Sequence, residues 1–343
     1  MPKQMDLTAM PLKTPQFWYD DRSVWPSLLS PLSACYDLAR NCHTSYRNKV
    51  TKPYISSVPV ICAGNIVAGG SGKTPTVIAI AKHAVEHGIA KNPVFLSRGY
   101  PGRLRGPILV DPKHHIAADV GDEALLLSRH QPTIIAHDRA QGARLAEEHK
   151  HDLIIMDDGL QNFSLHQDCK ILVVDGHRRF GNGKLLPAGP LRQSLQTIQD
   201  QLHGVIIIEN EPSTLSHPLV KGIAEFKATL QPTSSKDLKG NYVAFAGLAY
   251  PRKFYDTLQE LGVALKGWHD FPDHYPYSKG DLRKLQAEAK KQEAKLITTE
   301  KDFVRIPEEF RSSVETLPVS LALDSPGTLT PFLKNVIDEK AAS

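Results

Sequence analysis

Short apolar runs alternate along the chain with segments in which apolar residues recur every three or four positions. The runs predict buried strands and the segments between them predict amphipathic helices. This alternation is typical of an α/β protein whose parallel sheet is covered by helices on both faces. The predicted strands are Val58–Cys62, Asn92–Ser97, Thr133–Ala136, Leu153–Met156, Ile171–Val174 and Gly204–Ile208, and the helices Pro75–His87, 121–130 and Arg139–His149.

A second α/β pattern begins near residue 242. It comprises the strands Tyr242–Gly247 and Lys295–Thr299 and the helices Arg252–Leu261 and 281–294. We therefore expect three parts. The first is an N-terminal helix within residues 1–50. The second is a nucleotide-binding α/β domain over 51–210, which includes a connecting ribbon at about 176–193. The third is a smaller α/β domain over 211–343, and its C-terminal tail is a candidate to pack back on the nucleotide-binding domain.

The N-terminal part has an unusual pattern. Aromatic residues cluster at 16–25 and are followed by apolar positions at helical spacing and then by cations. Such a helix suits a membrane interface, with aromatics at the level of the headgroups. The same pattern also suits a helix packed on the core. The apolar positions are Trp25, Leu28, Leu29, Leu32, Cys35, Tyr36 and Ala39, and the cations Arg40, Arg47, Lys49 and Lys52.

Composition narrows the classes of function. The 343 residues suffice for two domains, and the hydrophobic share of 41% is that of a globular protein. A net charge of +4 is too small to indicate nucleic-acid binding. No apolar run approaches the ~18 residues of a spanning helix, and we expect neither export nor a membrane span. The cysteines, Cys35, Cys42, Cys62 and Cys169, have no metal-binding spacing and are expected to be reduced thiols.

The most informative stretch is VICAGNIVAGGSGKT at 60–74. A strand that enters a glycine-rich turn and then a helix points backbone N–H groups at an anion. Lys73 would reach the β- and γ-phosphates of ATP, and the hydroxyl of Thr74 would bind Mg²⁺. Val67 stands where the usual pattern has glycine. The predicted nucleotide-binding residues are Val67, Ala68, Gly69, Gly70, Ser71, Gly72, Lys73 and Thr74.

Two further features suit phosphoryl transfer. Asp157 and Asp158 follow an apolar strand and form a candidate Mg²⁺ site beside Thr74, although paired aspartates also form turns. Asp122 is a candidate base that could instead cap a helix, and His269 and His274 lie in the stretch HDFPDHYPYS. Arginines follow several strands, where such folds bind anions, among them Arg98, Arg139 and Arg192.

Seven motifs together carry a resemblance to a known family over nearly the whole chain. In order they are GNIVAGGSGKTP, LSRGYPGR, VGDEALLL, IIMDDGLQ, GNGKLLPAGPLR, FPDHYPYS and TTEKDFVRI. The chain resembles the tetraacyldisaccharide 4′-kinases, which are the lipid A 4′-kinases of Gram-negative bacteria. The resemblance implies a P-loop domain joined to a second α/β domain, with the active site in the cleft between them. It implies ATP-dependent phosphorylation of the 4′-hydroxyl of a tetraacylated glucosamine disaccharide 1-phosphate.

The resemblance also implies roles for single residues. The family's Asp–His pair matches Asp122 and His274, and its acidic Mg²⁺ pair matches Asp157 and Asp158. Arg98, Arg139 and Arg192 match positions that contact substrate or phosphate. The implied partners are the lipid substrate and a membrane surface, and no obligate protein partner is evident. The implied location is the cytoplasmic face of the inner membrane, with the N-terminal helix as a peripheral attachment.

Two departures from the family and two rival functions stand beside this interpretation. Gln193 replaces the family's usual Glu after PLR, and GLAYPRKF, with Tyr250, replaces the usual GIGNPERF. One rival is a membrane-associated P-loop ATPase that acts as a switch or partitioning protein, but such proteins carry a lysine where Ala68 stands. The other rival is a kinase or ligase with a soluble acceptor.

Overall fold

The structure is a computed structural model, and it describes residues 14–20, 22–70, 72–209, 219–233 and 238–342. The chain forms two compact units. The larger one consists of Phe17–Thr233 and Val319–Ser343, and the smaller one is built on Ser234–Pro318. Each unit has its own sheet and its own apolar core, and each is described here by itself.

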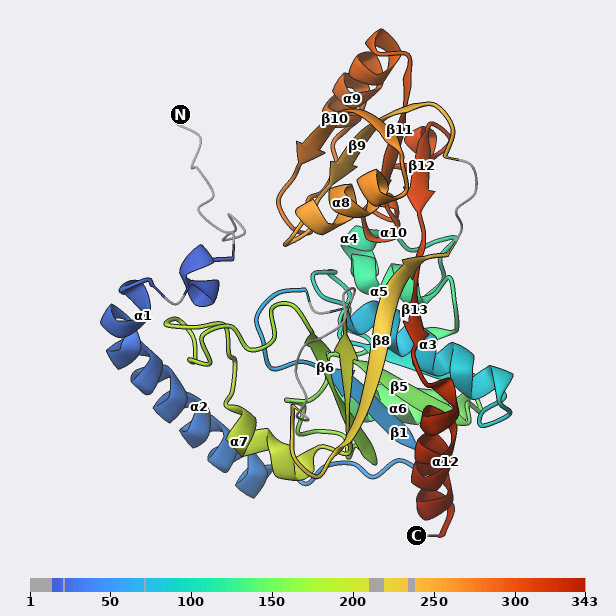
Figure 1. The fold of residues 1–343 in the computed structure, drawn as a ribbon. Coiled ribbons are helices and arrows are strands. Elements are labelled where there is room, and N and C mark those ends of the chain that lie inside the picture. The colour runs from blue at the N-terminus through green and yellow to red at the C-terminus, as the bar shows by residue number, and fades with distance from the viewer. Residues whose placement is uncertain (1–13, 21, 71, 210–218, 234–237, 343) are drawn as a thin grey trace, which may run out of the picture. The chain divides into compact units, whose positions relative to one another are not determined.

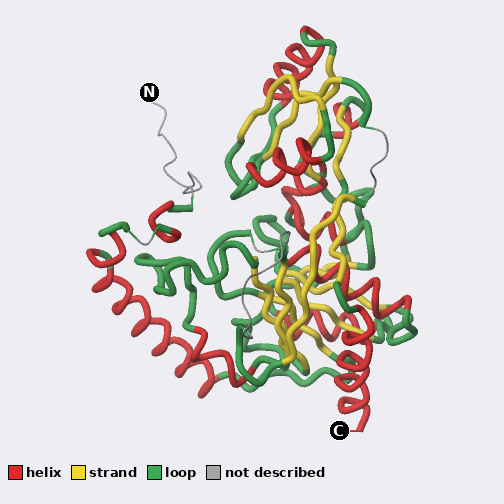
Figure 2. Tube along the Cα trace, viewed as in Figure 1, coloured by secondary structure: helices red, strands yellow, loops and turns green. Residues whose placement is uncertain are grey.

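A nine-stranded sheet in the order β13-β8-β7-β6-β1-β5-β2-β4-β3 forms the larger unit. All neighbouring strands run parallel except β3 with β4 and β13 with β8. The predicted α/β class with a mostly parallel sheet is therefore confirmed (Figures 1 and 2). The strands are β1 (Val60–Gly64), β2 (Pro93–Ser97), β3 (Ile108–Leu109), β4 (Thr133–Ile135), β5 (Leu153–Asp157), β6 (Cys169–Asp175), β7 (Gly204–Ile208), β8 (Ala224–Pro232) and β13 (Val319–Leu323).

Helices cover both faces of this sheet. On one face, α3 (Lys73–Glu86) and α12 (Pro326–Ala342) pack on the side of Ile61 and Ala63. On the other face, α6 (Arg139–Glu148) and α7 (Leu195–Ile198) pack on the side of Val60 and Cys62. Alternate residues of each central strand are thus buried on opposite faces, which explains why these strands are continuous apolar runs in the sequence.

The smaller unit has a four-stranded parallel sheet in the order β10-β9-β11-β12. Its strands are β9 (Asn241–Ala246), β10 (Ala264–Asp270), β11 (Ala294–Thr299) and β12 (Val314–Leu317). Helix α9 (Lys279–Lys291) covers one face and α8 (Arg252–Glu260) the other. The side chain of Ser278 caps α9, and Asp281 completes a capping box there. The short helices α10 (Glu300–Phe303) and α11 (Glu308–Arg311) complete this unit.

The boundary between the units lies later in the chain than the expected residue 211. Strand β8 pairs in parallel with β7, so this segment extends the nine-stranded sheet. The tail also belongs to the larger unit, because β13 pairs antiparallel with β8 and α12 packs on the same core. The smaller unit is therefore an insertion between two adjacent strands of the larger one.

The N-terminal segment lies at the outer edge of the larger unit, away from its sheet (Figure 1). It consists of η1 (Gln16–Tyr19), α1 (Trp25–Leu28) and α2 (Ser30–Val50). Helix α2 half-buries a polar stripe and exposes most of its apolar residues. The stripe contains Ser33, Tyr36, Asp37, Arg40, Thr44 and Arg47, whereas Leu32, Leu38, Tyr46 and Val50 of α2 are exposed, as are Trp25 and Leu28 of α1.

The alternative of an apolar stripe packed on the core therefore does not describe α2. Leu38, for example, is 67% exposed. Within the described ranges, no helix combines the length and the apolar character that crossing a membrane requires.

Candidate functional site

The glycine-rich turn between β1 and α3 has the predicted form. Gly72 is the N-cap of α3 with φ of 79°, and a Cβ atom there would collide with the side chain of Ile208. Only glycine adopts this left-handed conformation without strain. Lys73 and Thr74 are consequently the first two residues of the helix, where N–H groups point out of the helix end. Ser71 lies outside the described residues.

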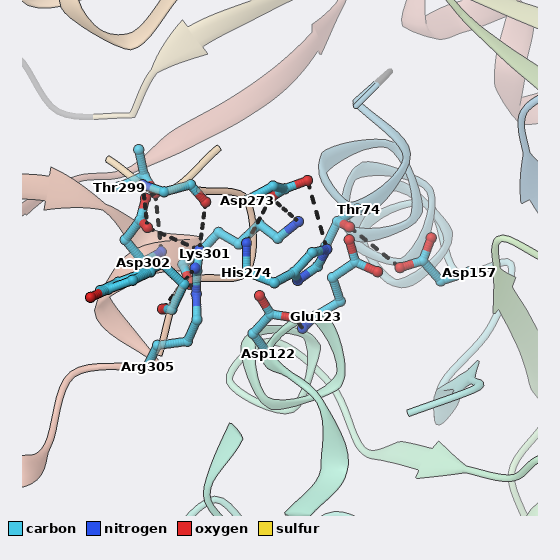
Figure 3. A network of polar contacts seen from close by, with 12 residues as sticks. Thr74, Asp122, Glu123, Asp157, Asp273, His274, Thr299, Lys301, Asp302 and Arg305 are labelled. Atoms are coloured by element: carbon cyan, nitrogen blue, oxygen red, sulfur yellow. Dashed lines mark hydrogen bonds and ion pairs between the residues drawn. The ribbon is translucent and has the colours of Figure 1, made fainter. Parts of the chain in front are cut away.

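Strand β5 brings the two aspartates to this turn. Ala63 of β1 pairs with Asp157, and the N–H of Asp158 donates to the carbonyl of Ala63 at 3.0 Å. The hydroxyl of Thr74 donates to Oδ2 of Asp157 at 3.3 Å (Figure 3). The ammonium of Lys73 lies 3.7 Å from Oδ2 of Asp158. The structure thus brings Lys73, Thr74, Asp157 and Asp158 together at one edge of the sheet.

The two carboxylates are incompletely satisfied. Asp157 is 3% exposed, and burial raises its pKa, an effect to which the charge of Glu123 adds and which Lys73 opposes. In the part of the chain that the structure describes, Oδ1 of Asp157 and Oδ1 of Asp158 are buried without a hydrogen-bond donor. A buried oxygen of this kind is costly unless a ligand satisfies it. Two carboxylates beside a threonine hydroxyl therefore fit a hard divalent cation such as Mg²⁺.

The ribbon at 176–193 pairs with the phosphate loop. Val67 forms an antiparallel bridge with Leu191, and the N–H of Ala68 donates to the carbonyl of Pro190 at 2.8 Å. The side chain of Val67 packs against the core at the same time. These contacts explain why a β-branched residue is suitable at position 67. The backbone there pairs with another segment and does not form a tight turn.

Arg192 ends this ribbon beside the acidic pair. Its Nη1 lies 3.4 Å from Oδ2 of Asp158, so Asp158 faces two cations, Lys73 and Arg192. The predicted Arg192 is therefore part of the cluster. The neighbouring Gln193 is buried.

Asp122 is the first residue of α5 (Asp122–Leu127), directly after the short helix α4 (Ala117–Val120). It is 1% exposed, and its Oδ1 accepts the N–H of Glu123 at 3.0 Å. Gly121, not Asp122, occupies the N-cap position, so the capping alternative is wrong. A Cβ on Gly121 would lie 2.6 Å from the carbonyl oxygen of Tyr100. The motifs VGDEALLL and LSRGYPGR thus approach closely through their glycines.

The other two predicted arginines follow β2 and β4. Arg139 is buried at the start of α6, where its guanidinium donates to the carbonyls of Ala136 and His137. Burial lowers its pKa to about 10, and the charge of Arg98 adds to this. The buried Nε of Arg139 has no acceptor among the described residues. An unpaired buried donor beside a second cation fits an anion such as a phosphate.

In the smaller unit, His274 lies on the loop that follows β10 and has φ of 58°. Its Nε2 is 3.8 Å from Oδ2 of Asp273, and the ammonium of Lys301 is 3.7 Å from Oδ1 of the same carboxylate (Figure 3). The carboxylate of Asp273 therefore lies between the imidazole of His274 and the ammonium of Lys301. His269 lies within β10 rather than in a loop, and its Nε2 is 2.8 Å from the carboxylate of Glu288.

A buried network that the sequence did not predict holds this loop. Asp302 is 0% exposed and accepts hydrogen bonds from the Gly247 N–H at 2.8 Å and the Tyr277 hydroxyl at 2.6 Å. Arg305 pairs with Asp302 at 2.9 Å (Figure 3). It also donates to the carbonyl of Tyr275 at 3.2 Å. The only sequence signal was the motif TTEKDFVRI, in which charged residues follow a buried strand.

The predicted residues thus belong to two groups. One group is a cluster in the larger unit that consists of Lys73, Thr74, Asp157, Asp158 and Arg192. The larger unit also contains Asp122 and Arg139. His274 belongs to the smaller unit.

A sequence model of the family described as tetraacyldisaccharide-1-P 4′-kinase matches residues 25–338. The chain is 43% identical to the tetraacyldisaccharide 4′-kinase of Paramagnetospirillum magneticum, over 95% of this chain and 99% of that protein. It is 40% identical to the enzyme of the same name from Rhodospirillum centenum, over 96% and 98%. A crystal structure of LpxK from Aquifex aeolicus in complex with ATP matches with a TM-score of 0.75 and 27% identity, covering 91% of this chain and 99% of that one.

Proposed function

Because the chain belongs to the tetraacyldisaccharide-1-P 4′-kinase family, we propose that the cluster around Lys73 and Asp157 is the place where it transfers a phosphoryl group. The activity follows from the family. It is ATP-dependent phosphorylation of the 4′-hydroxyl of a tetraacyldisaccharide 1-phosphate in lipid A biosynthesis. Neither rival function is needed, since the family accounts for the phosphate loop and for the rest of the motifs.

The donor half of the site is proposed from the phosphate loop. Backbone N–H groups of Gly69, Gly70, Gly72, Lys73 and Thr74 would face the phosphates of ATP, whereas those of Val67 and Ala68 donate to Asn65 and to the carbonyl of Pro190. Lys73 would place its charge at the β- and γ-phosphates. Thr74, Asp157 and Asp158 would hold Mg²⁺, which neutralises phosphate charge when bound. The single observation that carries this proposal is the pair of buried, unsatisfied carboxylate oxygens beside the loop.

The acceptor half is proposed from Asp122 and the arginines. Asp122 would take the proton of the 4′-hydroxyl as that oxygen attacks phosphorus, which is the usual role of an aspartate in phosphoryl transfer. We propose His274 as the residue that supports it, following the family's Asp–His pair. Arg98, Arg139 and Arg192 would hold phosphate groups, since the buried Nε of Arg139 still lacks an acceptor.

Single-turnover phosphorylation of the disaccharide 1-phosphate tests these roles. Lys73→Ala and Asp122→Ala should each lower the rate by about 10²-fold or more. Lys82→Ala is the matched control, because Lys82 lies on the same helix α3 in an exposed ion pair with Glu86. Rates at the level of the unmodified protein in both site variants would overturn the mechanism. Equal losses in Asp122→Ala, His274→Ala and the double variant would support the pair.

We further propose that the exposed apolar face of α1 and α2 binds a membrane surface, peripherally, at the cytoplasmic face of the inner membrane. This proposal is supported by the exposure of four apolar side chains and by the cations of α2. The four are Trp25, Leu28, Leu32 and Leu38. Leu28→Asp with Leu32→Asp should reduce sedimentation with anionic vesicles, whereas Leu28→Met with Leu32→Met, which keeps both positions apolar, should leave it nearly unchanged. Full vesicle binding by the double aspartate variant would place the attachment elsewhere.

A further inference from the structure

Arg192 is fixed through its backbone from two sides. Its N–H donates to the carbonyl of Ile66 in the phosphate loop at 2.7 Å. Its carbonyl accepts the hydroxyl of Tyr36 from helix α2 at 3.0 Å. The side chain of the same residue reaches Asp158 at 3.4 Å. One residue therefore joins helix α2, the phosphate loop and the acidic pair.

Other residues of the N-terminal segment hold the rest of this ribbon. The hydroxyl of Ser33 donates to the carbonyl of Leu185 at 2.8 Å and accepts the N–H of Ala188 at 3.0 Å. The indole N–H of Trp18 donates to the carbonyl of Pro187 at 3.0 Å. Ser33 is buried, so its two hydrogen bonds are shielded from water. The N-terminal segment thus contacts the ribbon through polar groups of three residues, Trp18 of η1 and Ser33 and Tyr36 of α2.

The ribbon depends on these contacts because it has little regular structure of its own. Between residues 182 and 192 it forms isolated bridges rather than a strand or a helix. Its internal hydrogen bonds include those from the N–H of Gly189 to the carbonyl of Leu185 and from the amide of Asn182 to the carbonyl of Ala188. A loop without a ladder is positioned by what packs against it. The stripe of polar residues on the inner side of α2 serves this purpose.

We propose that Tyr36 is a positioning residue for phosphoryl transfer, which acts by fixing Arg192 against Asp158 and the phosphate loop. This inference rests on the role proposed above for Arg192. Helix α2 then has two functional faces. Its outer face is apolar and exposed, and its inner face orients a cation of the active site. Tyr36 touches no phosphate and no acceptor in this account and acts only through Arg192.

A double-mutant cycle in kcat/KM tests the proposal, with the lipid acceptor in detergent micelles. Tyr36→Phe keeps the ring and removes the hydroxyl, and we expect it to lower kcat/KM about 5- to 20-fold, the effect of one hydrogen bond. Arg192→Ala should lower kcat/KM more. In the Arg192→Ala background, Tyr36→Phe should change kcat/KM by less than about twofold, because the residue through which it acts is absent.

Ser45→Ala is the matched control, because it also removes a hydroxyl from helix α2, at an exposed position, and should keep full activity. A merely structural role for Tyr36 predicts the same fold-loss in both backgrounds, and this result, or full activity of Tyr36→Phe, would overturn the inference alone. Full activity of Arg192→Ala would overturn the proposed role of Arg192 as well. Ser33→Ala provides a second cycle with the same expectation, should Tyr36→Phe prove too unstable to assay.

Discussion

Asp157 and Asp302 are both buried carboxylates near a positively charged side chain, but their hydrogen-bond donors differ. Asp302 receives donors on both oxygens, from the Gly247 N–H, the Tyr277 hydroxyl and Arg305 on one and from the Thr299 hydroxyl on the other. Asp157 receives the Thr74 hydroxyl on Oδ2 and has no donor on Oδ1 among the described residues.

The difference is what we expect between a structural carboxylate, Asp302, and the proposed metal ligand, Asp157. Charges and hydrogen bonds that are complete within the chain stabilise the fold, whereas a buried oxygen left without a donor costs stability until a ligand binds it. Burial and the charge of Asp302 also raise the pKa of Tyr277, so its hydroxyl stays protonated and continues to donate. Asp302 should therefore matter for folding and Asp157 for binding and catalysis.

The largest expected effect is that of Asp157→Asn on activity. The amide keeps the size of the side chain and removes the charge that would hold Mg²⁺, so kcat should fall by about 10³-fold or more. The melting temperature without nucleotide should stay unchanged or rise, because a desolvated charge has been removed. Measured kcat and thermal unfolding of the same preparation check both parts. A clear loss of stability with retained activity would instead indicate a structural role for Asp157.

Asp302→Asn should have the opposite profile. It removes the charge of one partner of a buried ion pair with Arg305, which should lower the free energy of unfolding by about 3–5 kcal/mol. Urea denaturation measures this. The control is Asp256→Asn in the same unit, because Asp256 is in an exposed pair with Arg252 and should change stability by less than about 1 kcal/mol. Equal effects of the two variants would contradict a structural role for Asp302.

Thr74→Val sharpens the comparison on the catalytic side. It removes the hydroxyl that donates to Asp157, which is also a proposed metal ligand, and leaves the volume of the side chain nearly unchanged. We expect kcat/KM for ATP to fall by about 10²-fold and the Mg²⁺ concentration needed for half-maximal rate to rise. Thermal unfolding should change little. An unchanged Mg²⁺ dependence would show that Thr74 is not a ligand of the metal.

Thr299→Val is the matched change on the structural side and has the smallest expected effect. Asp302 loses one of its donors, at 2.5 Å, and α10 loses its N-cap. The free energy of unfolding should fall by about 1–2 kcal/mol. The rate at saturating substrate should change less than threefold at temperatures where the variant is folded. A loss of activity as large as that of Thr74→Val would show that the two threonines are not functionally distinct.

The sequence predicted the phosphate site because its signals are local. Glycines, lysine and threonine lie next to each other at 69–74, and Asp157 follows an apolar strand directly. The central strands were predicted for a similar reason, since burial on both faces makes each of them a continuous apolar run. Strand β8 was not predicted, because it lies near the edge of the sheet and has a weak alternating pattern.

Features that depend on tertiary packing could not be predicted. The partners of Asp302 come from three separate segments, and no spacing in the sequence connects Gly247, Tyr277 and Thr299. Helix α2 was recognised as a helix, but which of its faces is buried is decided by the ribbon that Ser33 and Tyr36 contact. His269 was expected in a loop and instead pairs with Glu288 across a strand and a helix.

Calorimetric titration of ATP with and without Mg²⁺ tests the central claim most directly, because it needs no acceptor and no turnover. Mg²⁺ should strengthen ATP binding at least about tenfold, or 1.4 kcal/mol, in the unmodified protein, and this gain should disappear in Asp157→Asn. The exposed-pair variant Asp256→Asn should keep the full gain. An undiminished Mg²⁺-dependent gain in Asp157→Asn would contradict the claim that the unsatisfied oxygen of Asp157 exists to bind the metal-bound nucleotide.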